Sequence, residues 1–148
     1  MSTKQPIEGA TSPTKNHASL DQAELILRSI REAVVMTDLA GVVTYWNDAA
    51  TRMFGWSAEE MLGRPYAERY PAERRAWLEA QIAERAAGLE WDAEFEDLRK
   101  DGSSIWIRAQ VRKILGPDGQ PAGILGISQD ISAQKEAQRG MHAQEILE

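Results

Sequence analysis

The sequence contains no cysteine and only two histidines, His17 and His142, among its 148 residues. A chain without cysteine forms no disulfide, supplies no thiolate to a metal and carries no thiol nucleophile. The two histidines stand far apart, and neither belongs to a spacing typical of metal ligands. We therefore expect no metal site and no cysteine-based catalysis in this chain.

Positive charge and long hydrophobic stretches are also scarce. Lys and Arg number 17 against 23 Asp and Glu, which gives a formal net charge of −6. Binding to a nucleic-acid backbone needs clustered basic residues on one face, so nucleic acid is not an expected partner. No apolar run approaches a membrane span in length, and the first twenty residues have no hydrophobic signal core. We expect a cytoplasmic protein with no membrane contact in this segment.

Catalytic motifs are absent as well. The sequence has no nucleophile elbow, no histidine placed to serve one and no paired carboxylates in a suitable context. Residues 116–119 form a turn and not a phosphate-binding loop, because no helix with Lys-Ser or Lys-Thr follows them. We predict that this segment is not an enzyme.

The N-terminal region divides into two parts. Residues 1–18 have almost no large apolar side chain, which is typical of a disordered leader. Ser19 and Gln22 then have capping-box spacing, and the pattern that follows predicts an amphipathic helix over 19–32. The apolar stripe of this helix is assigned to a dimer interface and consists of Leu20, Ala23, Leu27 and Ile30.

From residue 33 onward the hydrophobic pattern predicts strands, over 33–38, 42–46, 91–96, 105–112 and 123–131. The first and last of these are apolar on both faces, so we place them in the centre of the sheet. The third and fourth alternate between apolar and polar residues and are joined by a tight Asp-Gly hairpin turn. Trp106 projects on the polar face of the fourth strand and is either an isolated surface aromatic or part of the dimer interface.

Three helices are predicted between the second and third strands. Asn47 caps the first, and Ser57 with Glu60 forms a capping box for the second. The third runs from Pro71 to Ala87, and its buried side consists of Trp77, Leu78 and Ile82. The expected fold class is therefore α+β, a five-stranded antiparallel sheet with short helices on one face.

Six short motifs follow one another in a set order. They lie at residues 38–41, 45–50, 54–63, 99–103, 116–119 and 126–132. This series resembles the PAS domain family of sensory modules and covers about two thirds of the chain. The resemblance implies a PAS-like core over 33–131, followed by a connecting helix that begins at residue 132. The helical pattern is still present at residue 148, so either the helix ends frayed or the chain has been cut from a longer protein, and we favour the second alternative.

The resemblance also implies a function. PAS modules sense a small ligand or relay a conformational signal, as homodimers, to an effector such as a histidine kinase or a cyclic-dinucleotide enzyme. Two alternatives are a protein–protein interaction domain without a ligand and a sensor that carries flavin or haem. A photoadduct-forming flavin is excluded because it needs a cysteine, and a histidine-ligated haem is not expected from the positions of His17 and His142. We expect no cofactor.

Three sets of residues are candidates for this function. Ligand-pocket candidates, which are equally typical of an ordinary core, are Tyr45, Met53, Phe54, Met61, Trp77, Phe95, Ile107 and Ser128. The Asp130-Ile131-Ser132 segment is similar to the family's Asp-Ile-Thr motif and is the candidate for signal transmission, although a plain helix cap explains it too. The family also implies a surface ion pair between Lys100 and either Glu59 or Glu60.

Overall fold

The computed structural model describes residues 22–23, 25–26, 31–86 and 90–147. The chain divides into two units, residues 1–30 and 31–148, and the second contains every strand described below. The predicted leader lies outside the described residues, as do Leu20, Leu27 and Ile30 of the predicted interface stripe. Gln22, Ala23, Leu25 and Ile26 are helical, while most of the helix predicted over 19–32 lies outside the described residues and stays a prediction.

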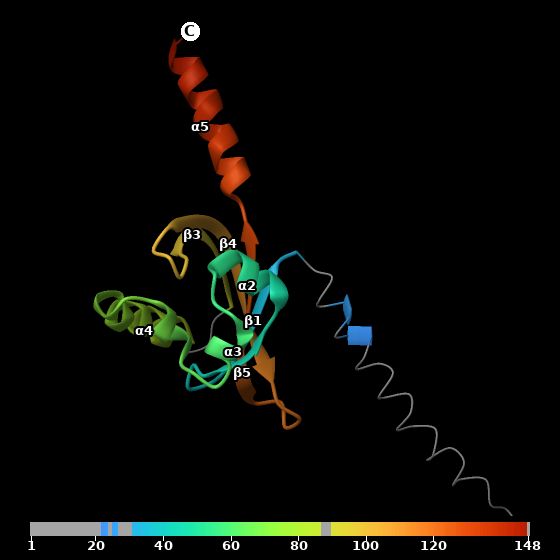
Figure 1. The fold of residues 1–148 in the computed structure, drawn as a ribbon. Helices are drawn as coiled ribbons and strands as arrows, with labels where there is room; N and C mark the ends of the chain where they lie inside the picture. The colour runs from blue at the N-terminus through green and yellow to red at the C-terminus, as the bar shows by residue number, and fades with distance from the viewer. Residues whose placement is uncertain (1–21, 24, 27–30, 87–89, 148) are drawn as a thin grey trace, which may run out of the picture. The chain divides into compact units, whose positions relative to one another are not determined.

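The second unit is built on one five-stranded antiparallel sheet (Figure 1). Its strands are β1 (Ala33–Asp38), β2 (Val43–Trp46), β3 (Trp91–Leu98), β4 (Ser104–Leu115) and β5 (Pro121–Asp130). The strand order is β2-β1-β5-β4-β3. The predicted central positions of the first and last strands are confirmed, since β1 and β5 each have a strand on both sides.

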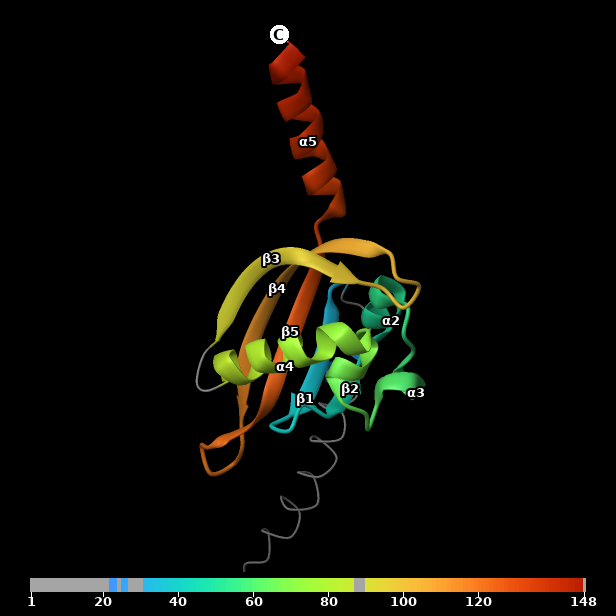
Figure 2. The same ribbon diagram turned by 90° about the vertical axis from the view of Figure 1, so that its left-hand side faces the viewer.

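Short helices connect β2 to β3. They are α2 (Asp48–Phe54), α3 (Ala58–Met61), the 3₁₀ helix η1 (Tyr66–Arg69) and α4 (Ala72–Ala86). Both predicted caps are confirmed: the Asn47 side chain accepts from the Ala50 N–H at 2.9 Å, and Ser57 and Glu60 form the reciprocal capping box. A last helix, α5 (Ser132–Leu147), follows β5 at the predicted residue and leads away from the sheet (Figure 2).

Side chains on one face of the sheet pack against α2 and α3 and form the core, which we call the inner face. Residues that stand opposite each other in antiparallel strands share a face, so the register assigns each strand position to the inner or the outer face. Val35 pairs with Trp46 and with Gly126, and Ala109 pairs with Ser128. The fully buried residues of this core include Val43, Phe54, Met61 and Ile107.

The free edge of β2 is covered by the segment that follows α3. The Val43 N–H donates to the Arg64 carbonyl at 2.9 Å, and the Gly63 N–H donates to the Val43 carbonyl at 2.9 Å. Val42 also forms an isolated bridge with Pro65. The chain between α3 and η1 therefore takes the place of a sixth strand over a short stretch.

The close approach of β1 and β5 requires a glycine at position 123. A Cβ atom built there would lie 2.4 Å from the Thr37 carbonyl oxygen, which is far inside van der Waals contact. The register pairs Gly123 with Asp38 at the end of β1. Residue 123 thus allows the two central strands to stay paired up to the β1–β2 turn.

The prediction that Trp77 lies on the buried side of its helix is wrong. α4 occupies the predicted range, yet the Trp77 side chain is 59% exposed. The helix is attached mainly through its first turn, where Arg75 Nε donates to the Tyr70 carbonyl at 2.8 Å, and it packs chiefly on η1. Because α4 does not lie flat on the sheet, its amphipathic pattern does not translate into burial.

Candidate functional site

Most of the predicted pocket residues face the core and fill it. Met53, Phe54, Met61 and Ile107 are all buried members of one hydrophobic cluster, and Phe54, Met61 and Ile107 are each 1% exposed. Side chains packed so completely leave no space for a ligand beside them. This part of the inner face therefore supports the ordinary-core interpretation of those residues.

A second part of the inner face is only half-buried. It consists of Trp91 and Phe95 of β3, with Ala93 between them and Ser128 on β5. The Trp91 and Phe95 rings lie with their centroids 6.4 Å apart and flank the small Ala93 side chain. α4 lies on this side of the sheet (Figures 1 and 2). Among the predicted pocket residues, Phe95 and Ser128 belong to this area, which we call the open inner face.

Tyr45 does not belong to either part, and its predicted place in a pocket between sheet and helices is wrong. It pairs with Met36, whereas Trp46 pairs with Val35 and is buried in the core. Tyr45 therefore points to the outer face of the sheet. An irregularity in the β1–β2 register, between Met36 and Thr37, lets both Val43 and Trp46 face inward although they are three positions apart, a spacing that places residues of a regular strand on opposite faces.

A buried ionic cluster that the sequence analysis missed lies between η1 and β3. Arg69 Nη1 is 3.2 Å from Asp97 Oδ1, and the two side chains are 0% and 2% exposed. The Arg69 Nη2 group donates to the Leu98 carbonyl at 3.0 Å, and the Tyr70 hydroxyl donates to Asp97 Oδ1 at 2.5 Å. Arg69 also donates to the Tyr70 and Tyr66 hydroxyl oxygens. The cluster thus holds a 3₁₀ helix to an edge strand.

The electrostatics of this cluster keep Arg69 charged in the interior. Burial disfavours a charged guanidinium, but Tyr66, Tyr70 and Asp97 together raise the pKa of Arg69 above its ordinary value. Burial raises the pKa of Tyr66, and it raises the pKa of Tyr70 well above the usual value, so both phenols stay neutral. The guanidinium lies 4.2 Å above the Phe54 ring centroid, which adds a cation–π contact.

One signal in the sequence points to this cluster. The inward positions of β3 run Trp91, Ala93, Phe95 and then Asp97, so the alternation itself directs a carboxylate toward the core. A buried carboxylate needs a cation, and sequence spacing alone does not identify which one. Arg69 is 28 residues away along the chain and lies in a segment without a strong helical pattern.

The expected surface ion pair is present and uses Glu60. Lys100 Nζ lies 2.5 Å from Glu60 Oε2, with both side chains partly exposed. The hydrogen bond from Lys100, followed by the one from the Ser57 N–H, lowers the pKa of Glu60 to about 2. The Lys100 N–H also donates to the Phe54 carbonyl at 2.8 Å, so the β3–β4 hairpin is held against α2 and α3.

The Glu60 carboxyl is therefore expected to titrate near pH 2, in contrast to the ordinary value of 4.5. A lowered pKa in the folded state means that the pair stabilises the fold above pH 4.5 and that this contribution is lost as the pH falls toward 2. In Lys100→Met the carboxyl carbon resonance of Glu60, followed by NMR, should titrate closer to 4.5. Arg99→Met is the matched control, because it removes a neighbouring cation that does not contact Glu60. An unchanged Glu60 midpoint in Lys100→Met would contradict the assignment.

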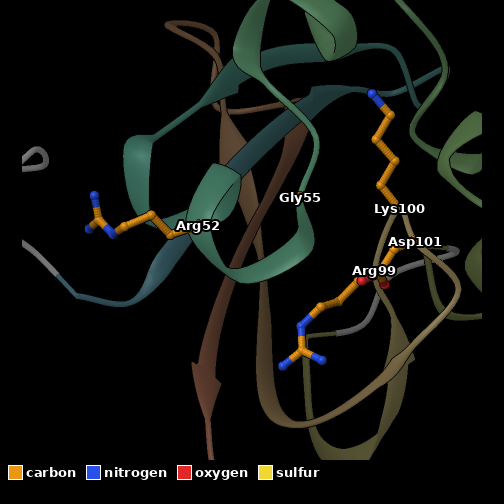
Figure 3. A pocket seen from close by; sticks show the side chains of 5 residues that line it. All are labelled: Arg52, Gly55, Arg99, Lys100 and Asp101. Carbon is orange, nitrogen blue, oxygen red and sulfur yellow. The ribbon is translucent and has the colours of Figure 1, made fainter.

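A surface hollow of about 440 Å³ lies beside this hairpin and is lined by Arg52, Gly55, Arg99, Lys100 and Asp101 (Figure 3). Figure 3 shows the Arg52 and Lys100 side chains pointing away from each other. Arg99 donates to Ser103 Oγ and to the Ser104 carbonyl, and Lys100 is paired with Glu60. The cations therefore do not converge on one ligand, and none of the predicted pocket residues lines this hollow.

The predicted transmission residues come together where β5 ends and α5 begins. Asp130 Oδ1 accepts from the Ser132 N–H at 2.9 Å. Ile131 is 1% exposed, and its N–H donates to the Trp106 carbonyl at 3.0 Å. A capping carboxylate, a buried anchor and a backbone hydrogen bond to β4 therefore define the start of the helix.

Trp106, the predicted interface residue of the sheet, has a partner within the chain. It lies on the outer face opposite Glu96. The Lys135 Nζ atom of α5 lies over the Trp106 ring, 4.7 Å from the ring centroid, in a cation–π contact. Lys135 Nζ is also 3.1 Å from Glu94 Oε1. The outer face of β3 and β4 is thus a charged surface that includes the ion pairs of Glu94 with Arg108 and Asp92 with Arg112.

No helix in the described part of the chain is both long and apolar enough to span a membrane. Within those same residues, no three His, Asp or Glu side chains are grouped so that they would hold a metal ion.

Comparison with known proteins finds a matching family. The model of the PAS fold matches residues 21–131. Sporulation kinase C of Bacillus subtilis (strain 168) is 27% identical over 120 residues, which are 80% of this chain and 28% of the kinase. The probable diguanylate cyclase DgcE of Escherichia coli (strain K12) is 44% identical over 45 residues, 30% of this chain and 4% of the cyclase.

A solved structure shows the same fold. The PAS domain of a protein from Colwellia psychrerythraea superposes with a TM-score of 0.66 and 28% sequence identity, covering 77% of this chain and 98% of that one. The sheet and helices described above therefore have the fold of a solved PAS domain.

Proposed function

This chain belongs to the PAS family, and from that premise we propose that it is a ligand-sensing, dimerising module that passes a conformational signal through α5 to an effector. One observation carries the proposal. Ser128 faces the open inner face, and Asp130, two residues later on the same strand, caps α5. A ligand that contacts Ser128 would therefore displace the strand to which the output helix is attached.

The proposed ligand site is the open inner face between α4 and the sheet. Trp91 and Phe95 offer apolar, aromatic contact, and Ser128 supplies a hydroxyl that can orient a polar group of the ligand. This combination of apolar surface with few polar groups is typical of small-molecule sites. The filled cluster around Phe54 and Met61 closes the remainder of the interior, so the proposed ligand is small.

A second candidate is favoured by the same filled interior. Phe54, Met61 and the buried Arg69 already occupy the space between the sheet and the helices. This filled interior also fits a module that binds no ligand and relays the conformation of a partner protein. In this alternative the open inner face binds a protein segment. The relay through β5 and α5 is the same in both.

Dimerisation is proposed to use the apolar half of the outer face. Met36, Tyr45, Leu125 and Ile127 are partly buried and share this face on β1, β2 and β5. It adjoins the charged surface of β3 and β4, which is less suited to a dry interface. The predicted helix over 19–32 is the proposed second element of the dimer.

We propose that the segment itself does not catalyse a reaction. In the related kinase and cyclase the matched regions are small parts of longer chains, 28% and 4% of their lengths. A kinase or cyclase domain elsewhere in the parent protein is the proposed effector. A cytoplasmic location stays a prediction from composition.

Native mass spectrometry of freshly purified protein tests the proposal, because it reports subunit number and retained small molecules together. We expect the mass of a dimer with a bound small molecule that is lost on collisional heating. A dimer without bound mass would favour the relay alternative. A monomer that carries no ligand would contradict both.

A further inference from the structure

The edge strand β3 is held on its two faces by two different parts of the chain. On the inner face Asp97 pairs with Arg69 of η1 at 3.2 Å. On the outer face, three residues earlier, Glu94 pairs with Lys135 of α5 at 3.1 Å. β3 thus connects the base of α4, which borders the open inner face, with the first turn of the output helix.

The outer contact is a shared one. Glu94 Oε2 accepts from Arg108 Nη2 at 2.6 Å, while Oε1 faces Lys135 Nζ. Arg108 and then Lys135 lower the pKa of Glu94, so the carboxylate stays charged at neutral pH. The Lys135 ammonium lies between this carboxylate and the Trp106 ring, at 4.7 Å from its centroid. Lys135 therefore bridges β3 and β4 from a single position on α5.

Within the described part of the chain, α5 has few other attachments to the sheet. Its backbone begins at the buried Ile131, whose carbonyl accepts from the Lys135 N–H at 3.0 Å. From residue 136 to residue 141 every side chain is exposed. Ile131 fixes the point where the helix starts, but a single point does not fix its direction. Lys135, one turn later, supplies the second point.

We propose that Lys135 is the positioning residue that sets the direction of α5, and that β3 transmits movements of η1 to it through Asp97 and Glu94. This inference deepens the proposed function and rests on it, since it names the route from the ligand side to the output helix. The Glu94–Lys135 pair is partly exposed, with 36% of the Glu94 side chain and 25% of the Lys135 side chain accessible. Ion pairs near the surface are weak, so a small displacement of β3 suffices to break it. Separating the buried Arg69–Asp97 pair would leave each charge in the interior without its partner, so β3 follows η1.

The absence of cysteine allows a direct test. Spin labels on Gln110→Cys of β4 and Gln138→Cys of α5, both exposed positions, report the distance between sheet and helix by pulsed electron paramagnetic resonance. Labelled protein is diluted into unlabelled protein so that only distances within one chain are measured. Lys135→Met should raise the population outside the main distance peak roughly two- to fivefold, the factor that corresponds to loss of an exposed ion pair.

Two further variants define the outer contact. Glu94→Gln should broaden the distance distribution as Lys135→Met does. The double variant Glu94→Gln with Lys135→Met should show no more broadening than either single variant, because both changes remove the same interaction. Arg139→Met is the matched control: it removes a cation one turn later on α5, where the side chain is exposed. An unchanged distribution in Lys135→Met, or an equal broadening in Arg139→Met, overturns the proposal.

The contact of η1 with the inner face of β3 is tested with Tyr70→Phe. This change removes the hydroxyl that donates to Asp97 and keeps the ring, so the protein is expected to fold. It should broaden the distances in the wild-type background and have no further effect in Lys135→Met. Tyr45→Phe, which removes a hydroxyl from the outer face of β2, is the control. No effect of Tyr70→Phe overturns transmission through β3.

The failure of this inference is distinguishable from failure of the proposed function. None of these measurements requires a ligand to be added, and each compares variants that differ only in the contacts of η1, β3 and α5. If native mass spectrometry finds a ligand but the distances to α5 are unchanged in Lys135→Met, the inference about Lys135 is wrong and the proposed sensing function still stands. A monomer without ligand whose α5 is released by Lys135→Met ends the proposed function and leaves the contact established.

Discussion

Arg69→Met is expected to lower the free energy of unfolding by about 3–5 kcal/mol, the cost of removing one partner from a buried ion pair. The methionine keeps much of the apolar volume but leaves the Asp97 carboxylate buried without its cation. The Tyr70 hydroxyl and the Leu98 N–H, which both donate to Asp97, do not neutralise its charge. Urea unfolding followed by far-ultraviolet circular dichroism measures the effect.

The double variant Arg69→Met with Asp97→Leu provides the control. Replacing both charges by apolar side chains removes the desolvation penalty of each, so most of the lost stability should return. If the double variant is as unstable as Arg69→Met alone, the loss comes from packing around Arg69, including its 4.2 Å contact with Phe54, and the electrostatic explanation is wrong.

Phe54→Ala is expected to cost about 3–5 kcal/mol, as is usual for removing a buried aromatic ring from a core. Phe54 is 1% exposed and its ring packs against Trp46, with centroids 6.1 Å apart, and against the Arg69 guanidinium. The change therefore opens a cavity and removes one side of the cation–π contact. Urea unfolding again gives the free energy.

Phe54→Leu is the matched variant for this prediction. It keeps an apolar side chain of similar reach and should cost less than half as much. A loss below about 1 kcal/mol in Phe54→Ala would show that the ring is not part of a tightly packed core. In that case the space around Phe54 would return as a candidate ligand pocket.

The features that the sequence predicted well are those decided by local chemistry. Asn47, Ser57 and Glu60 each satisfy a free backbone N–H within three residues, so their capping roles are set by local sequence. The central places of β1 and β5 follow from their apolar residues on both faces, because only an interior strand is covered twice. Such patterns can be interpreted from the sequence without knowledge of the tertiary contacts.

The residues that were misplaced depend on contacts that sequence spacing does not encode. Tyr45 and Trp46 are neighbours, and which one faces inward is decided by the irregularity between Met36 and Thr37. Trp46 is favoured there because its indole N–H finds acceptors in Thr51 Oγ1 at 3.1 Å and the Trp56 carbonyl at 2.9 Å. These acceptors lie five and ten residues away, Thr51 in α2 and Trp56 in the segment between α2 and α3.

Trp77 is exposed and Arg69 is buried, the opposite of what their polarity suggests. The cause is again a contact between distant segments of the chain. The tryptophan lies on a helix that is attached by its first turn, whereas the arginine lies on the short η1 segment that is packed against β3. Whether a side chain is buried depends on how its element docks, and the docking of η1 depends on Asp97. How η1 and α4 dock also decides which residues of the inner face stay half-buried, so the sequence does not predict which residues form the open inner face.

The covering of β2 by residues 63–65 has a consequence for how copies of this domain associate. An uncovered strand offers free backbone N–H and C=O groups that can recruit a strand from another molecule. At one end of the sheet Val43 already exchanges hydrogen bonds with Gly63 and Arg64. At the other end β3 carries Asp92, Glu94 and Glu96 on one face, and charged side chains on an edge strand disfavour the addition of a further strand. Continuation of the sheet from one molecule into the next is thus disfavoured on both sides, which protects the domain against fibre-like aggregation.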